Sequence, residues 1–181
     1  AAAESGTELD FTPPMLLCNG VNMVPNGDFE NYFACPPAFS FLSYAQPWTG
    51  WSSEFFHACA PFASGVSVPG NFIGNQTPYS GSGYGGCYVY FNTGNVTNSN
   101  REYLETPLIA PLIAGMQYQV SFRVSRADNC THAIAEIGAA FSTGNVSNYF
   151  ALTPQVVNPS ANIITSATNW TLIAGTFTAT G

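Results

Sequence analysis

Few side chains in this sequence could carry out acid–base or nucleophilic chemistry, and the two histidines come first. His57 lies in an aromatic stretch that ends at Cys59, and His132 follows Cys130 in a predicted turn. On a strand, residues two positions apart are separated by about 7 Å, which is too far for a hydrogen-bonded cysteine–histidine pair. The sequence has no G-x-S-x-G motif either. We therefore interpret both histidines as structural or exposed.

Acidic side chains offer a second route to catalysis, because paired carboxylates hydrolyse glycosidic bonds. Of the ten acids, five are the candidates for such a pair: Glu54, Glu102, Glu105, Asp128 and Glu136. They do not cluster in the sequence, so a catalytic pair would have to form in space. The sequence favours a protein that is not an enzyme.

A glycine-rich stretch has the spacing of a dinucleotide-binding loop. Gly81, Gly83 and Gly86 match G-x-G-x-x-G. Such a loop must open a helix whose N-terminus faces the pyrophosphate, whereas residues 87–91 have the composition of a strand. We do not expect a dinucleotide site here.

The charge balance excludes several partners. The chain has 181 residues, with three arginines, no lysine and ten acids, for a net charge of -7. A protein that binds nucleic acid or an anionic membrane surface needs a cluster of Lys and Arg residues, so we expect neither as a partner. No apolar run approaches the roughly 20 residues of a membrane span. Aromatic residues make up 14% of the chain, which argues for a packed core rather than disorder.

The cysteines and the N-terminus indicate an oxidising compartment. The chain begins with three alanines, small residues of the kind that remain after signal-peptide cleavage. None of the five cysteines forms a C-x-x-C pair, so disulfides are favoured over a zinc site. We predict Cys35–Cys59 and Cys87–Cys130 bonds, with Cys18 free or bonded to another chain, although sequence alone does not fix the connectivity. We expect a secreted, extracellular or cell-surface protein.

The pattern of apolar residues predicts strands and no helix. In residues 116–126 the side chains of Tyr118, Val120, Phe122 and Val124 alternate with polar ones, which is typical of a strand with one buried face. Further strands are predicted at residues 21–30, 85–92, 101–108, 133–142 and 170–179. We predict an all-β, antiparallel β-sandwich of the jelly-roll type over residues 21–181, preceded by an extended N-terminal arm, residues 1–20.

Five stretches, in their order along the chain, carry a family resemblance. They are residues 22–30 (NMVPNGDFE), 79–86 (YSGSGYGG), 101–104 (REYL), 114–118 (AGMQY) and 170–178 (WTLIAGTFT). Together they resemble galactose-binding-like jelly-roll modules, a group that includes many carbohydrate-binding modules. The closest likeness is to modules in surface proteins of gliding bacteria, which often end in a type IX secretion sorting segment.

The resemblance implies one more strand than this sequence holds. Such modules continue beyond residues 177–181 into a further strand, and a sheet that lacks a strand has an open edge. We therefore expect a structural or adhesive subunit that assembles with copies of itself into an extracellular filament by strand exchange through the arm. The apolar residues of the arm are Phe11, Met15, Leu16, Leu17 and Cys18. The alternatives are an arm that rests on its own sandwich and a truncated chain.

The same resemblance implies a second function, the binding of a polysaccharide. Exposed aromatic rings stack on the apolar face of a pyranose, and amide side chains bind its hydroxyl groups. The candidates are Trp48, Trp51, Tyr79 and Tyr84, with Gln46, Asn71 and Gln76 as polar neighbours. The competing interpretation of these aromatic residues is packing in the core or between subunits.

Modules of this kind often hold one structural calcium ion near the first strand. Asn26, Asp28 and Glu30 offer the hard oxygen ligands that suit calcium. Part of such a site commonly comes from the last strand, which this sequence lacks, and a solvated turn explains the same residues equally well.

Overall fold

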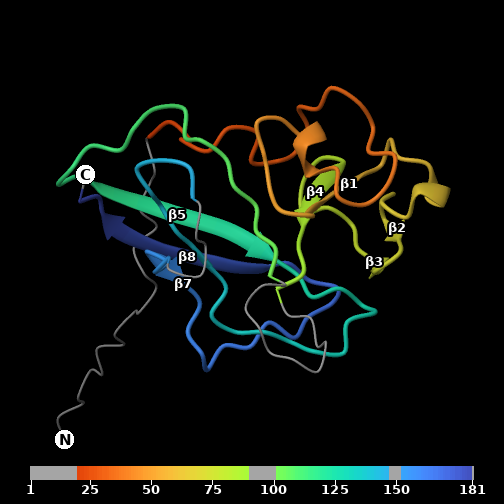
Figure 1. Ribbon diagram of the computed structural model, residues 1–181. Helices are drawn as coiled ribbons and strands as arrows, with labels where there is room; N and C mark the ends of the chain where they lie inside the picture. Colours follow the sequence, from red (N-terminus) through yellow and green to blue (C-terminus); the bar gives the residue numbers. More distant parts are fainter. Residues whose placement is uncertain (1–19, 90–100, 147–151, 181) are drawn as a thin grey trace, which may run out of the picture.

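The computed structural model describes residues 20–89, 101–146 and 152–180, and their architecture is all-β (Figure 1). The strands are β1 (Glu54–His57), β2 (Gly70–Asn71), β3 (Gly74–Asn75), β4 (Gly83–Gly86), β5 (Gln117–Val124), β6 (Gly138–Ala139), β7 (Val156–Val157) and β8 (Thr171–Thr178). Two short 3-10 helices, η1 (Leu42–Tyr44) and η2 (Phe62–Ser64), are the helical elements of the described residues. The predicted all-β class is confirmed. No helix in these ranges is long and apolar enough to cross a membrane.

The strands form antiparallel pairs rather than the two larger sheets of a sandwich. Within the described residues, β1 pairs with β4, β2 with β3, β5 with β8, and β6 with β7. Residues 1–19 of the predicted arm, including Phe11, Met15, Leu16, Leu17 and Cys18, lie outside the described residues.

The longest sheet within the described residues is the β5–β8 pair, which confirms the strands predicted in residues 116–126 and 170–179. Its eight-residue ladder runs from Gln117 opposite Thr178 to Val124 opposite Thr171. The inward residues of β8 include Ile173, which is 3% exposed. A Cβ at Gly175 would lie only 3.1 Å from Val156 of β7, so β7 packs closely on this strand.

The β1–β4 pair lies at the centre of the N-terminal half. All four residues of β1 are buried. A Cβ at Gly83 would lie 2.6 Å from His57, and one at Gly86 would lie 2.6 Å from Phe56. The glycine-rich stretch therefore allows β4 to lie against the bulky side chains of β1, and it forms a strand rather than a phosphate-binding loop.

The core of this half is small and aromatic. Phe56, Ala60 and Val66 are buried together, and the partly buried side chains of Phe39, Val68, Ile73 and Tyr84 pack around them. The Cys35–Cys59 disulfide links residues 31–36 to the end of β1, with a Cα–Cα distance of 5.7 Å. This bond confirms the first of the two predicted pairings.

Several predicted strands are shorter than expected or do not form. Residues 21–30 make turns, with Asn26 and Phe29 at positive φ, because the Asn26 amide is hydrogen-bonded to the backbone of Asn31 and Gln46. Of residues 101–108, only Glu105 forms a bridge, to Thr49. The strand expected at residues 85–92 lies earlier, in β4, and residues 90–92 are outside the described ranges.

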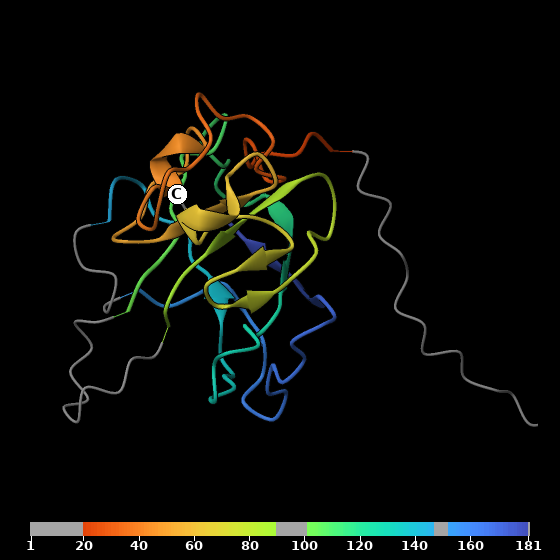
Figure 2. The same ribbon diagram turned by 90° about the vertical axis from the view of Figure 1, so that its right-hand side faces the viewer.

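The segment 133–142 is also less regular than predicted. It contains the two-residue β6 and an isolated bridge from Ile134 to Ile164. Figure 2 shows the loops before β6 and before β8 running side by side at one end of the molecule. Arg126 ties these loops together, because its backbone N–H donates to Ser166 and its Nε donates to Thr165.

Candidate functional site: a cleft and an open sheet edge

A large cleft is lined by residues of β5, of the segment that precedes it and of much of the described chain. Val120, Phe122 and Val124 of β5 line it together with Leu104, Leu108 and Leu112, and its volume is about 2650 Å³. Small-molecule pockets are typically about 300–1000 Å³. The size and apolar lining of this cleft suit a polypeptide segment or a polymer better than a single small ligand.

Four of the seven predicted glycan-binding residues line this cleft on one wall: Asn71, Gln76, Tyr79 and Tyr84. The Asn71 amide donates to the Tyr84 hydroxyl over 2.9 Å, and Ser125 donates to the Gln76 side chain over 2.9 Å. Burial raises the pKa of Tyr84 to about 12, against the opposing effect of the Asn71 hydrogen bond. The phenol therefore stays neutral at physiological pH.

Two further residues, Arg123 and Trp170, complete this wall. Arg123 lies over the Tyr79 ring, 3.9 Å from its centroid. Trp170 meets the Tyr84 ring edge-on and donates from Nε1 to the Thr77 carbonyl. The alternation of apolar and polar residues in β5 predicts a polar side chain at Arg123. Nothing in the spacing of the sequence predicts that this side chain contacts Tyr79.

The other three predicted glycan-binding residues lie away from this wall. Trp48 lines the cleft but stacks on Phe29 and donates to the Asn26 carbonyl. Trp51 is 75% exposed, and neither it nor the exposed Gln46 belongs to the lining of the cleft. The structure therefore divides the predicted set into one group on the cleft wall and three separate residues.

Two of the five candidate acids influence each other in space. Burial raises the pKa of Glu54 to about 7, and the Glu102 carboxylate adds to this effect. The pKa of Glu102 is also raised by burial. Each carboxylate accepts a backbone N–H, from Ser40 and Tyr88 respectively, so both are used to position loops.

The other three candidate acids are separate from this pair. Glu105 accepts from the backbone of Val146, and Asp128 accepts from that of Asn75. Glu136 is exposed and has a positive φ.

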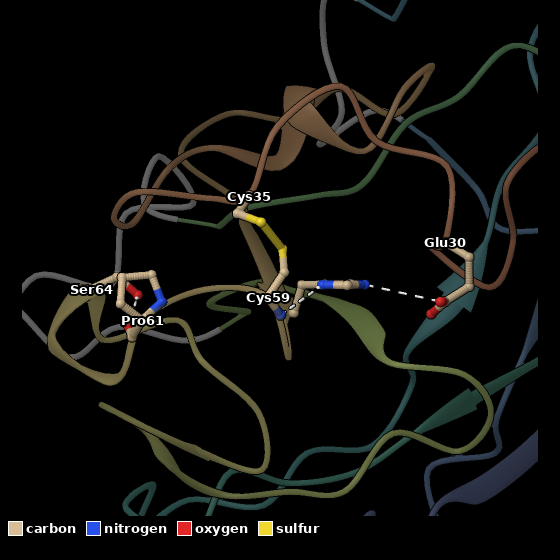
Figure 3. The surroundings of a disulfide bond; sticks show 6 residues. Glu30, Cys35, Cys59, Pro61 and Ser64 are labelled. Atoms are coloured by element: carbon tan, nitrogen blue, oxygen red, sulfur yellow. Dashed lines mark hydrogen bonds and ion pairs between the residues drawn. A yellow bond between two sulfur atoms is a disulfide. The ribbon is translucent and has the colours of Figure 1, made fainter.

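The predicted calcium ligands point to different partners (Figure 3 draws Glu30). Glu30 accepts hydrogen bonds from the backbone N–H groups of Ser82 and Gly83, and it lies 4.0 Å from Nε2 of His57. The Asn26 amide is bonded to the backbone, as described above, and Asp28 is exposed. The described residues contain no cluster of three or more histidine, cysteine or acidic side chains suited to a metal. The calcium site stays a prediction.

His57 has a structural role next to Cys59, whose disulfide Figure 3 draws. Its Nδ1 accepts the backbone N–H of Cys59 over 3.0 Å, which places the proton of the neutral ring on Nε2, facing Glu30. Burial lowers the pKa of His57, and Glu30 partly opposes this. His132 is exposed, with Nδ1 3.0 Å from the Thr131 hydroxyl.

The second predicted disulfide is wrong. Cys87, which follows β4, and Cys130, in the loop after β5, are free thiols. The side chain of Arg126 donates to the Cys130 carbonyl and holds that loop. Burial raises the pKa of the Cys87 thiol to about 12.

The β5–β8 sheet has two outer edges. Each strand pairs with the other, and within the described residues neither pairs with a third strand. An unpaired edge presents N–H and C=O groups that another strand can bind. The cleft and the edge of β5 together make the candidate site.

No protein-family model, curated protein or solved structure matches this chain.

Proposed function

We propose that this chain is a secreted, non-catalytic structural subunit that assembles with copies of itself by strand addition. A jelly-roll sandwich would then be completed by a strand that another subunit donates. The observation that carries the proposal is the eight-residue β5–β8 ladder with both outer edges unpaired in the described residues. Two-stranded sheets are marginal by themselves, so added strands would stabilise this one.

The charge and the disulfide support the same proposal. The Cys35–Cys59 bond is compatible with an oxidising compartment. A chain with three basic residues and a net charge of -7 suits association through backbone hydrogen bonds and apolar contacts better than binding to a polyanion.

The test is the assembly state of the full chain compared with a chain that lacks residues 1–20. Size-exclusion chromatography with light scattering and electron microscopy should show polymers of the full chain and monomers of the shortened chain. A full chain that stays monomeric at all accessible concentrations would refute self-assembly.

A second candidate function is glycan binding, and the wall formed by Asn71, Gln76, Tyr79 and Tyr84 favours it. Tyr79 is 59% exposed, so one part of its ring is available for stacking on a sugar. Affinity electrophoresis in gels that contain soluble polysaccharides tests this function. Tyr79→Ala should abolish any retardation, and the matched control Trp51→Ala should not, because Trp51 lies outside the cleft lining.

A further inference from the structure

The two outer edges of the β5–β8 sheet can be told apart by the hydrogen-bond pattern. Ala179 donates its N–H to the Met116 carbonyl, and this pair continues the register of the ladder. Hydrogen-bonded and non-hydrogen-bonded pairs alternate in an antiparallel ladder. Ser121 and Ala174, which lie opposite each other, therefore form a non-hydrogen-bonded pair. The backbone groups of Ser121 face outward from β5, and those of Ala174 face outward from β8.

Of the two strands of this sheet, β5 lines the cleft over the longer stretch. Residues 120–125 line the cleft without a gap, whereas β8 contributes Leu172, Phe177 and Thr178. Because residues 120–125 include side chains from both faces of β5, we infer that the backbone edge of this strand borders the cleft. The opposing leucines, Leu104, Leu108 and Leu112, supply an apolar surface for the side chains of a strand that pairs with this edge.

The described chain begins beside the same cleft. The Met23 carbonyl accepts the N–H of Ile109 over 3.0 Å, which fixes the start of the domain to the wall that carries the three leucines. Val21 is 76% exposed, so the start of the described chain is open to solvent. Nineteen residues precede the described part, which is more than the eight that a strand matching β5 requires.

Resting on the self-assembly proposed above, we propose that the edge of β5 is the acceptor site and that residues 8–17 of a second copy occupy it. In that segment the odd positions are apolar and the first three even positions are polar. The apolar set is Leu9, Phe11, Pro13, Met15 and Leu17, and the polar set is Glu8, Asp10 and Thr12. This alternation directs one face of the donor strand toward the leucines of the cleft and the other toward solvent.

The two prolines of the donor segment define where it pairs. Pro13 and Pro14 lack the N–H that a ladder needs, so backbone pairing occurs on either side of them. Ten extended residues span about 33 Å, and the eight residues of β5 span about 27 Å. The segment is therefore long enough to cover β5 completely.

Proline substitutions on the two edges test the assignment in the full chain. Ser121→Pro removes an outward N–H from β5, and Ala174→Pro removes the matching one from β8. Both side chains are exposed, and neither change deletes a β5–β8 hydrogen bond. We expect Ser121→Pro to reduce polymer formation at least tenfold, as measured by light scattering, and Ala174→Pro to leave it within twofold of the wild type.

A photo-crosslinking amino acid, p-benzoylphenylalanine, in place of Phe11 gives a second measurement that does not depend on the folding of a variant strand. A mixture of 15N-labelled and unlabelled chains should give mixed-isotope crosslinks to residues 117–125 or 104–112. Crosslinks confined to one chain, or to β8, would overturn the assignment. If the wild type assembles and both proline variants assemble equally well, self-assembly stands and the β5 acceptor is wrong. If the wild type is monomeric, both proposals fail.

Discussion

The guanidinium carbon of Arg123 lies 3.9 Å from the ring centroid of Tyr79. This contact joins β5 to the segment that follows the β2–β3 hairpin, across one wall of the cleft. Ser125, two residues further along, bonds Gln76 of the same segment. Side chains at the end of β5 therefore hold this wall of the cleft to the β5–β8 sheet. The Arg123–Tyr79 pair offers a way to measure how much this attachment contributes to the stability of the protein.

The first prediction concerns the Arg123–Tyr79 pair. A cation–π contact at an exposed site contributes about 0.5–1 kcal/mol. Arg123→Met keeps the aliphatic packing and removes the charge, so it should lower the free energy of unfolding by that amount. A double-mutant cycle with Tyr79→Leu, measured by urea denaturation, should give a coupling energy of the same size. Additive effects of the two changes would contradict the contact.

The second prediction concerns the disulfide. Cys35 and Cys59 are separated by 24 residues, and a loop of that length contributes about 3 kcal/mol in the chain-entropy model. Replacing both cysteines with serine should lower the free energy of unfolding by this amount, and adding a reductant to the wild type should reproduce the loss. Cys130→Ser is the control, because Cys130 is a free thiol. An equal loss in the control would count against the assigned pairing.

The elements that could be predicted from the sequence are those with strong local patterns. In β5, Tyr118, Val120 and Phe122 alternate with polar residues, and the pattern is long enough to be decisive. The strand at residues 170–179, observed as β8, was also predicted, and both strands depend on their own stretch of sequence. The Cys35–Cys59 bond was one of two proposed pairings, and sequence alone did not fix it.

The features that sequence could not predict depend on partners far along the chain. Residues 21–30 look like a strand, yet the Asn26 side chain takes the hydrogen bonds that a ladder would use. The Glu54–Glu102 pair and the Tyr79–Arg123 contact join segments more than 40 residues apart, and no local period encodes them. The Cys87–Cys130 prediction was wrong, since both thiols are free, and cysteine spacing alone does not fix a pairing.

The third prediction concerns the close approach of β4 to β1. A Cβ at Gly83 would lie 2.6 Å from the His57 ring and 3.1 Å from the Phe56 carbonyl. Overpacking of this kind costs about 1–3 kcal/mol, so Gly83→Ala should lower the free energy of unfolding by that amount in urea titrations. Gly144→Ala is the matched control, since no atom lies within 4 Å of its Cβ. Similar stability of the two variants would show that β4 lies farther from β1 than described.

The fourth prediction concerns the pH dependence of stability at Glu54. Burial raises its pKa from an ordinary value of 4.5 to about 7, with the Glu102 carboxylate adding to the shift and the Ser40 hydrogen bond opposing it. The folded state therefore binds the proton more tightly than the unfolded state does. By linkage, this group makes the protein less stable as the pH rises from 4.5 to 7, and its contribution is constant above that.

Glu54→Gln isolates this effect from the opposite contribution of His57. Burial lowers the pKa of His57, so the stability linked to His57 is lost as the pH falls below about 6.5. The difference in free energy of unfolding between Glu54→Gln and the wild type cancels the His57 contribution. That difference should increase in favour of the variant between pH 4.5 and pH 7, as measured by urea denaturation across this range. Asp28→Asn changes an exposed carboxylate and serves as the control. Parallel curves for Glu54→Gln and the wild type would mean that Glu54 is solvated in the folded protein and that the Glu54–Glu102 pair does not form.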